Sequence, residues 1–163
     1  GTRVADVAAG VLGPADPRPI TPSTLFCVFS VSKSILTLGV LRLIQEGTIG
    51  LDDPISDHWP AFAKNGKEGI TVRHVLSHQA GLPDVAPKGD MTLDAFLDWE
   101  GMKRAVEDAE PAHLPGAQTR YHYLTYAWLC GGIIESATGR PYEEVLAEVV
   151  TRPLGVCGGL YMR

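Results

Sequence analysis

The sequence has no long apolar run, few cysteines and no block of basic residues, and each absence excludes a class of protein. No stretch reaches the roughly 18 uninterrupted apolar residues of a membrane span, and the N-terminus lacks the basic-then-apolar pattern of a signal peptide. The three cysteines lack the paired spacing of a zinc site or a disulfide framework. A formal net charge of -5 without basic clusters argues against a nucleic-acid or anionic-membrane partner. The sequence therefore predicts a soluble protein without a metal site, and does not indicate its compartment.

What is present is enough for one globular core. The chain has 163 residues, of which 45% are hydrophobic and 20% charged, so it is too hydrophobic for a disordered segment. Both ends look like interrupted patterns. Residues 1–14 resemble the middle of a strand that ends at a Gly-Pro turn, and residues 153–163 contain a Gly-Gly turn followed by what reads as another strand. We interpret the chain as part of a larger domain.

Between the ends, apolar periodicity and capping residues predict helices. They are expected over residues 31–46, 71–79, 92–109, 124–138 and 141–151, with Thr71 and Thr92 as N-caps and Pro141 at a first helical position. The segment 31–46 is apolar on nearly every face and is closed by Gly47. It is therefore expected to be the central helix, buried on most sides.

The stretch FSVSKSIL, residues 29–36, places Ser30 and Lys33 at the start of this helix. Side chains three residues apart are neighbours on a helix, so the hydroxyl and the amine would project together. A serine hydroxyl needs a neighbouring base to become a nucleophile, and an ordinary lysine is charged at neutral pH. Apolar neighbours would disfavour that charge: Phe26, Val28, Phe29 and Leu36. The alternative is a Ser/Lys pair that only caps and solvates a helix start.

Five segments in register carry a resemblance to a known family. They are FSVSK, QEGTIGLDDPI, ITVRHVLSHQAGLP, PGAQTRYHYLTYAWLCGGIIESATGRPYEEVL and PLGV. Their order and spacing resemble the serine β-lactamase-like, penicillin-recognising hydrolases, near the branch of class C β-lactamases, D-Ala-D-Ala carboxypeptidases and β-lactamase-fold esterases. The resemblance runs from about Val4 to Val156. It implies an α+β, β-lactamase/transpeptidase-like fold, with residues 1–163 supplying mostly the helical half and the start of an antiparallel sheet.

The resemblance also implies roles for individual residues. Ser30 matches the nucleophile that forms an acyl-enzyme, Lys33 its lysine, and Tyr121 the tyrosine of a Tyr-x-Asn motif. Tyr123 stands where the family has asparagine, so one phenolic hydroxyl replaces an amide. This departure bears on β-lactam or peptide recognition more than on the nucleophile. We assign Tyr123 and His122 to substrate binding, with a core ring as the alternative for Tyr123 and a solvent-facing position for His122.

The family's third motif, a Lys-Thr-Gly or His-x-Gly on a closing strand, is absent from the sequence. Loss of one oxyanion donor typically costs on the order of 100- to 1000-fold in rate, so we expect no turnover from these 163 residues alone. An open sheet edge would also invite a partner strand. Two hypotheses follow: a cofactor-free serine hydrolase acting on an ester or amide, or a non-catalytic structural or interaction module.

Other polar and aromatic residues have structural interpretations. His74 and His78 lie four residues apart on one expected helix, which suits metal binding, but no third ligand accompanies them. The tryptophans at 59, 99 and 128 are expected in the core or at a subdomain contact.

Overall fold

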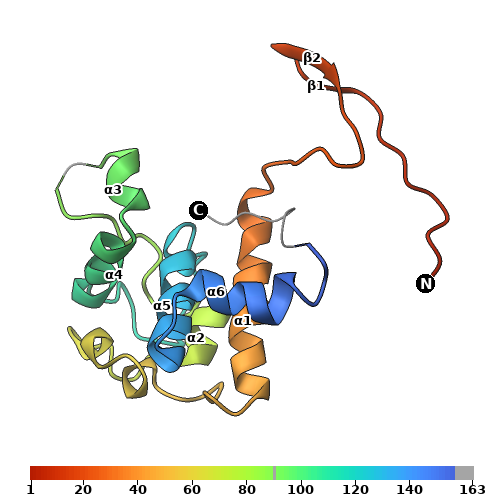
Figure 1. Ribbon diagram of the computed structural model, residues 1–163. Helices are drawn as coiled ribbons and strands as arrows, with labels where there is room; N and C mark the ends of the chain where they lie inside the picture. Colours follow the sequence, from red (N-terminus) through yellow and green to blue (C-terminus); the bar gives the residue numbers. More distant parts are fainter. Residues whose placement is uncertain (90, 157–163) are drawn as a thin grey trace.

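The computed structural model describes residues 1–89 and 91–156, which form a helical body preceded by an extended N-terminal arm, residues 1–28 (Figure 1). In chain order the elements are β1 (Val11–Gly13), β2 (Asp16–Pro19), the 3₁₀ turn η1 (Phe29–Val31), α1 (Ser32–Gln45), the 3₁₀ turns η2 (Ile55–Asp57) and η3 (Pro60–Ala63), α2 (Val72–Leu76), α3 (Leu93–Leu97), α4 (Trp99–Asp108), α5 (Thr125–Thr138), α6 (Tyr142–Leu146) and the π-turn η4 (Ala147–Thr151). None of the helices in this part of the chain is long and apolar enough to cross a bilayer.

The N-terminal arm carries the only sheet within the described residues, an antiparallel hairpin. Val11 lies opposite Pro19 and Gly13 opposite Asp16, so the predicted turn at Gly13-Pro14 is confirmed. The strand expected over residues 1–14 is wrong for residues 1–9, which have no regular structure. A strand needs a hydrogen-bonded neighbour, and none of the described segments pairs with those residues.

Helix α1 packs one face into the helical body. Leu36, Val40 and Leu43 are buried there at helical spacing, together with Gly39. A Cβ added at Gly39 would overlap the side chain of Leu146, so the absence of a side chain lets α1 approach α6 closely. The predicted central helix over 31–46 is confirmed to within a residue of the observed α1 at each end.

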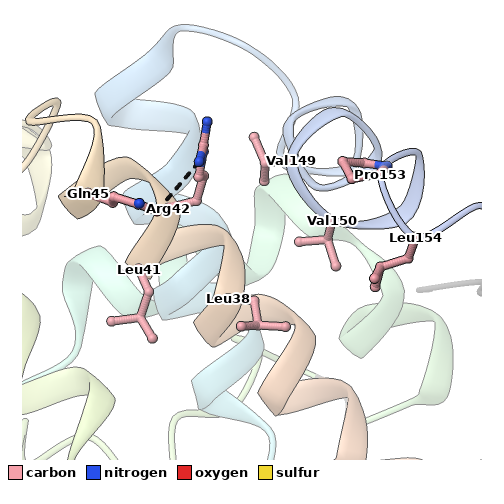
Figure 2. Close-up of a pocket in the computed structure, with 8 residues that line it drawn as sticks. All are labelled: Leu38, Leu41, Arg42, Gln45, Val149, Val150, Pro153 and Leu154. Atoms are coloured by element: carbon pink, nitrogen blue, oxygen red, sulfur yellow. Dashed lines mark hydrogen bonds between the residues drawn. The ribbon is translucent and has the colours of Figure 1, made fainter. Parts of the chain in front are cut away.

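The opposite face of α1 is open, which corrects the expectation that this helix is buried on most sides. Leu38 and Leu41 are 46% and 43% exposed. They form one wall of a shallow groove of about 300 Å³, and Val149 to Leu154 form the other (Figure 2). The apolar residues expected all round α1 therefore meet packing partners on one side only within the described residues.

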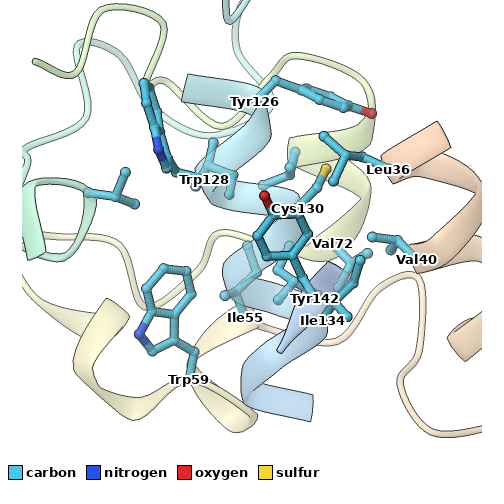
Figure 3. Packing of buried hydrophobic residues seen from close by; sticks show 14 of the residues in the cluster. Leu36, Val40, Ile55, Trp59, Val72, Tyr126, Trp128, Cys130, Ile134 and Tyr142 are labelled. Atoms are coloured by element: carbon cyan, nitrogen blue, oxygen red, sulfur yellow. The ribbon is translucent and has the colours of Figure 1, made fainter. Parts of the chain in front are cut away.

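Helix α5 is the centre of the core, because nearly all of its residues from Thr125 to Ile134 are buried. Figure 3 shows side chains from α1, α5 and α6 meeting around it. Trp59 and Trp128 belong to the buried cluster and Trp99 packs against it, as expected from the sequence. The helix ends at Gly139, whose φ of +67° is the left-handed conformation of a glycine C-cap.

The single helix expected over residues 92–109 is two helices, α3 and α4. Thr92 caps α3 as predicted, accepting a hydrogen bond from the Ala95 N–H at 3.2 Å. The chain then breaks at Asp98, whose backbone is extended and whose carboxylate accepts the N–H of Gly101 at 3.0 Å. An aspartate that caps a new helix favours a break in an otherwise continuous amphipathic pattern.

A buried lysine joins η3 to the end of α4. Lys67 is 0% exposed, and its Nζ donates to the carbonyl oxygens of Lys64 and Glu107, both at 2.8 Å, and of Ala109 at 2.5 Å. Burial lowers the pKa of this ammonium group, while nearby carboxylates, Asp108 first among them, oppose the change. Three acceptors satisfy its three N–H donors, so the cation stabilises the C-terminal end of α4.

Candidate active site

The turn that leads into α1 brings Ser30 and Lys33 together. Ser30 lies in η1 and Lys33 in the first turn of α1, so both side chains leave the helix start on the same side. Lys33 Nζ donates a hydrogen bond to Ser30 Oγ at 3.1 Å. The spacing of the two residues in the sequence is therefore realised as direct contact between the hydroxyl and the amine.

Lys33 is held in place by the segment around residue 123. Its Nζ donates to the backbone carbonyl oxygen of Tyr123 at 2.6 Å. The same nitrogen lies 5.0 Å from the ring centroid of Tyr121 and 5.7 Å from that of Tyr123, within the range of cation–π attraction. Although Tyr123 lacks a side-chain amide, its main chain supplies an acceptor for the lysine.

Tyr121 completes a three-residue cluster with Ser30 and Lys33. Hydrogen bonding to Ser30, and then to Lys33, lowers the pKa of the Tyr121 phenol from its ordinary value of 10, and the lysine charge acts in the same direction. The side chain is half exposed, so substrate can approach it from solvent. The arrangement brings a candidate nucleophile, an amine and a phenol into one cluster.

His122 is placed differently from its neighbours in the sequence. It is 0% exposed, its Nε2 accepts the N–H of Leu82 at 3.1 Å, and its Nδ1 faces the carbonyl oxygen of Arg120 at 2.7 Å. Burial lowers the pKa of this imidazole to about 4. Both ring nitrogens are thus engaged inside the protein, whereas Tyr121 and Tyr123 are exposed.

The surroundings of Ser30 are more open than expected. Phe26, Val28 and Phe29 are 66%, 47% and 78% exposed, and only Leu36 of the expected apolar neighbours is buried. The expectation that these side chains enclose the lysine is therefore wrong for three of the four. They instead form an apolar, solvent-facing surface next to the nucleophile.

The backbone immediately before Ser30 is unusual. Phe29 has a φ of +44°, a left-handed conformation that bulky residues seldom adopt. Its carbonyl oxygen accepts the hydroxyl of Ser32 at 2.6 Å, which helps to hold this turn. Strained residues of this kind cluster at functional sites, and here the strain immediately precedes the candidate nucleophile.

Comparison with known proteins fits this geometry. The family model described as Beta-lactamase matches residues 1–157. The chain belongs to the beta-lactamase family. Its relatives include the Esterase/beta-lactamase LipL of Mycobacterium tuberculosis, 34% identical over 158 residues that cover 97% of this chain and 36% of LipL. Esterase EstB of Burkholderia gladioli is 30% identical, covering 86% of this chain and 40% of EstB.

A solved structure has a similar fold over the part that this chain matches. A penicillin-binding protein homolog from Caulobacter crescentus superposes with a TM-score of 0.82 at 33% identity, covering 90% of this chain and 39% of that one. The β-lactamase/transpeptidase-like fold expected from the sequence is therefore confirmed. This beta-lactamase-family chain spans about two fifths or less of the length of these three proteins.

The structure also contains site features that the sequence analysis missed. The carbonyl of Tyr123 is a main-chain group, which side-chain motifs do not reveal. His78, first considered as a metal ligand, packs against Tyr121 with ring centroids 4.8 Å apart. The helix expected over residues 71–79 contains His78, but α2 ends at Leu76 and His78 has a left-handed backbone with a φ of +60°, so the sequence analysis missed this contact. No group of three candidate ligand side chains in the described part of the chain is placed to hold a metal.

Proposed function

We propose that this beta-lactamase-family protein is a serine hydrolase that cleaves an ester or amide carbonyl through an acyl-enzyme. The contact between Lys33 Nζ and Ser30 Oγ at 3.1 Å, with the Tyr121 ring centroid 5.0 Å from the same nitrogen, is the observation that carries the proposal. Activated serine nucleophiles need a base within this distance. The relatives named esterases point to the same class of reaction.

In the proposed reaction, Ser30 Oγ attacks the carbonyl carbon while its proton passes to the Tyr121 oxygen. Tyr121 takes part as the phenolate, whose negative charge the Lys33 ammonium stabilises until the proton from Ser30 arrives. The Ser30 N–H lies at the start of the helix, where backbone N–H groups lack partners within the helix and favour negative charge, so it supplies half of an oxyanion hole. The leaving alkoxide or amine takes the proton. Water then attacks the acyl-enzyme and releases the acid, and Ser30 regains its proton.

We infer that an ester is preferred to a β-lactam or peptide. Tyr123 offers no side-chain amide for a peptide-like substrate, its ring is 62% exposed, and Phe29, which immediately precedes Ser30, is 78% exposed. Such an apolar surface favours an acyl group over a polar peptide backbone. We therefore keep Tyr123 as a substrate contact, add Phe29, and withdraw His122, because its ring is buried and both of its nitrogens are engaged inside the protein.

Intact-mass spectrometry on the naturally produced protein tests the proposal. After incubation with a fluorophosphonate, we expect a mass increase of one phosphonyl adduct that Ser30→Ala abolishes. Ser34→Ala is the matched control, because Ser34 is an exposed serine one turn further along the same helix. A penicillin in a parallel incubation separates ester from lactam chemistry. An unmodified mass in folded wild-type protein would overturn the hydrolase proposal.

The second candidate function is a non-catalytic structural or interaction module. Tyr123 in place of asparagine favours it, as does the open edge of the β1–β2 hairpin, which would accept a partner strand. This alternative predicts no Ser30 adduct, together with a partner whose binding is lost when Val11 is replaced by proline. The same labelling experiment therefore separates the two functions.

A further inference from the structure

His78 contacts the chain on both sides of Tyr121. Its backbone carbonyl accepts the N–H of Arg120 at 3.0 Å, and its Nδ1 accepts the N–H of His122 at 3.1 Å. The two donors are the residues immediately before and after Tyr121. One histidine thus fixes the main chain that carries the candidate catalytic phenol.

The ring of His78 supports the phenol as well. Its centroid lies 4.8 Å from the rings of Tyr121 and Tyr126 and 5.5 Å from that of His122. Tyr126 is itself fixed, since its hydroxyl is 2.7 Å from Thr37 Oγ1 on α1. The imidazole is therefore packed between a rigid part of the core and Tyr121.

Holding this position requires a strained backbone. His78 follows the end of α2 with a φ of +60°, and its N–H donates to the Val75 carbonyl at 3.0 Å. Left-handed backbone of this kind is unfavourable for a residue other than glycine. A residue kept in such a conformation indicates that its side chain is needed at that place.

We propose that His78 is a positioning residue, which holds Tyr121 against Ser30 and Lys33 through a neutral imidazole that accepts the His122 N–H. The inference rests on the proposed hydrolase function for its effect on rate. The placement of Tyr121 itself does not depend on that function. A protonated Nδ1 has no lone pair to accept with, so protonation breaks the bond that fixes the chain after Tyr121.

The charged and titratable groups around His78 favour the neutral form. Burial lowers the pKa of His78, and Lys33 on α1 lowers it further. Tyr121, His122 and Tyr126 face it from the other side. On its own segment, Arg73 is paired with Asp52, and His74 accepts the N–H of Thr71. The hydrogen bond from the His122 N–H to His78 Nδ1 is therefore intact at neutral pH and is lost at acidic pH.

Two substitutions of His78 test separately the role of its hydrogen-bond acceptor and the role of its left-handed backbone. In His78→Asn, the amide oxygen stands close to the position of Nδ1 and asparagine tolerates left-handed backbone. We expect Ser30 labelling within about 3-fold of wild type, and no loss of labelling on the acid side from a histidine titration, because the amide oxygen still accepts the His122 N–H and does not titrate. His78→Gly relieves the strain but removes the acceptor and ring, and we expect labelling about 100-fold slower in a folded protein.

A readout independent of hydrolysis uses the backbone amide resonances of Arg120 and His122 followed by NMR against pH. In wild type, the His122 amide should shift as His78 titrates below its ordinary pKa of 6.5, and this step should be absent from His78→Asn. His58→Asn, which alters a histidine paired with Asp53, is the matched control and should leave the step in place.

The outcomes are distinguishable. Wild-type-like labelling in His78→Gly would overturn the role of His78, and so would an Arg120 and His122 amide titration in His78→Asn that is identical to wild type; the step from the His122 imidazole itself, at a pH of about 4, is expected in both proteins. If no variant and no wild-type protein is labelled, the hydrolase proposal fails, and the NMR titration alone then decides whether His78 positions Tyr121.

Discussion

The first turn of α1 and the turn that follows it differ in exposure. The first carries the candidate reactive groups, and the second is buried in the core. At the start of α1, Ser30 and Lys33 are partly exposed, follow a strained Phe29 and contact the 121–123 segment through polar groups. One turn later, Leu36 is 2% exposed in the core. The helix therefore carries reactive groups at its strained, open end and is anchored by the buried face behind them. Substitutions in the two turns should change different measurements.

The largest expected effect is on rate, from Lys33→Met. Methionine keeps the length of the side chain and removes the amine that bonds Ser30 Oγ, so fluorophosphonate labelling of Ser30 should slow by about 10²- to 10⁴-fold. The free energy of unfolding should change by less than about 1 kcal/mol, because the site is half exposed. Arg42→Met on the same helix removes an exposed ion pair with Glu46 and should alter neither quantity appreciably. Labelling at the wild-type rate in Lys33→Met would exclude the amine from the reaction.

The next effect is on stability, from Leu36→Ala. Removing a fully buried leucine should lower the free energy of unfolding by about 2–5 kcal/mol in a urea titration. Leu38→Ala, on the open face of the same helix, should cost less than about 1 kcal/mol. Equal costs would mean that something in the natural protein covers the groove of Figure 2.

The pH dependence of stability comes next. The pKa of His122 is lowered from 6.5 to about 4, so the unfolded chain binds more protons than the folded one between these values. The contribution of His122 to the free energy of unfolding should be fully present above pH 6.5. It should be lost, by on the order of 3 kcal/mol, as the pH drops to about 4. His78 contributes in the same direction. His122→Gln should flatten the slope measured by urea titrations at several pH values, and an unchanged slope would contradict the assignment.

The smallest effect is expected from Tyr126→Phe. The Tyr126 hydroxyl is 2.7 Å from Thr37 Oγ1, which itself donates to the Lys33 carbonyl at 2.8 Å, so the tyrosine is the donor to Thr37. Figure 3 shows this ring reaching from α5 toward α1. Losing one buried hydrogen bond while keeping the ring should cost about 1 kcal/mol in a thermal or urea melt. Tyr123→Phe, on an exposed ring, should not change stability, and equal effects would contradict this difference in burial.

Elements with strong local signals were predictable from the sequence. α1 and α5 were predicted to within a residue or so because long apolar periodicity and caps define them, and Thr71 caps α2 as expected. The break at Asp98 was missed because its capping carboxylate competes with an unbroken amphipathic pattern. Residues 1–9 were mistaken for strand because alternation describes a side chain's preference and says nothing about whether a neighbouring strand is present.

For the site, helical spacing predicted that Ser30 and Lys33 would meet, and the resemblance to the family added Tyr121. Neither predicted the exposure of Phe26 and Phe29, because exposure depends on which segments pack around the turn. The sequence did not predict the contact of Lys33 with the Tyr123 carbonyl or the hydrogen bond of the His122 N–H to His78, because both involve main-chain groups. Side-chain motifs thus locate the candidate reactive groups, whereas the main-chain contacts that position these groups can be found only from the structure.

Chemical modification of the buried Lys67 ammonium group would report local unfolding at the end of α4. Its three carbonyl acceptors and complete burial keep it from reagents that acylate exposed amines, whereas Lys64 and Lys88 have side chains 52% and 75% exposed and would react at once. Lys67 becomes reactive only when the end of α4 separates from the η3 loop. The rate at which it is modified therefore counts how often this part of the helical body unfolds, in a protein that is otherwise left in its native state.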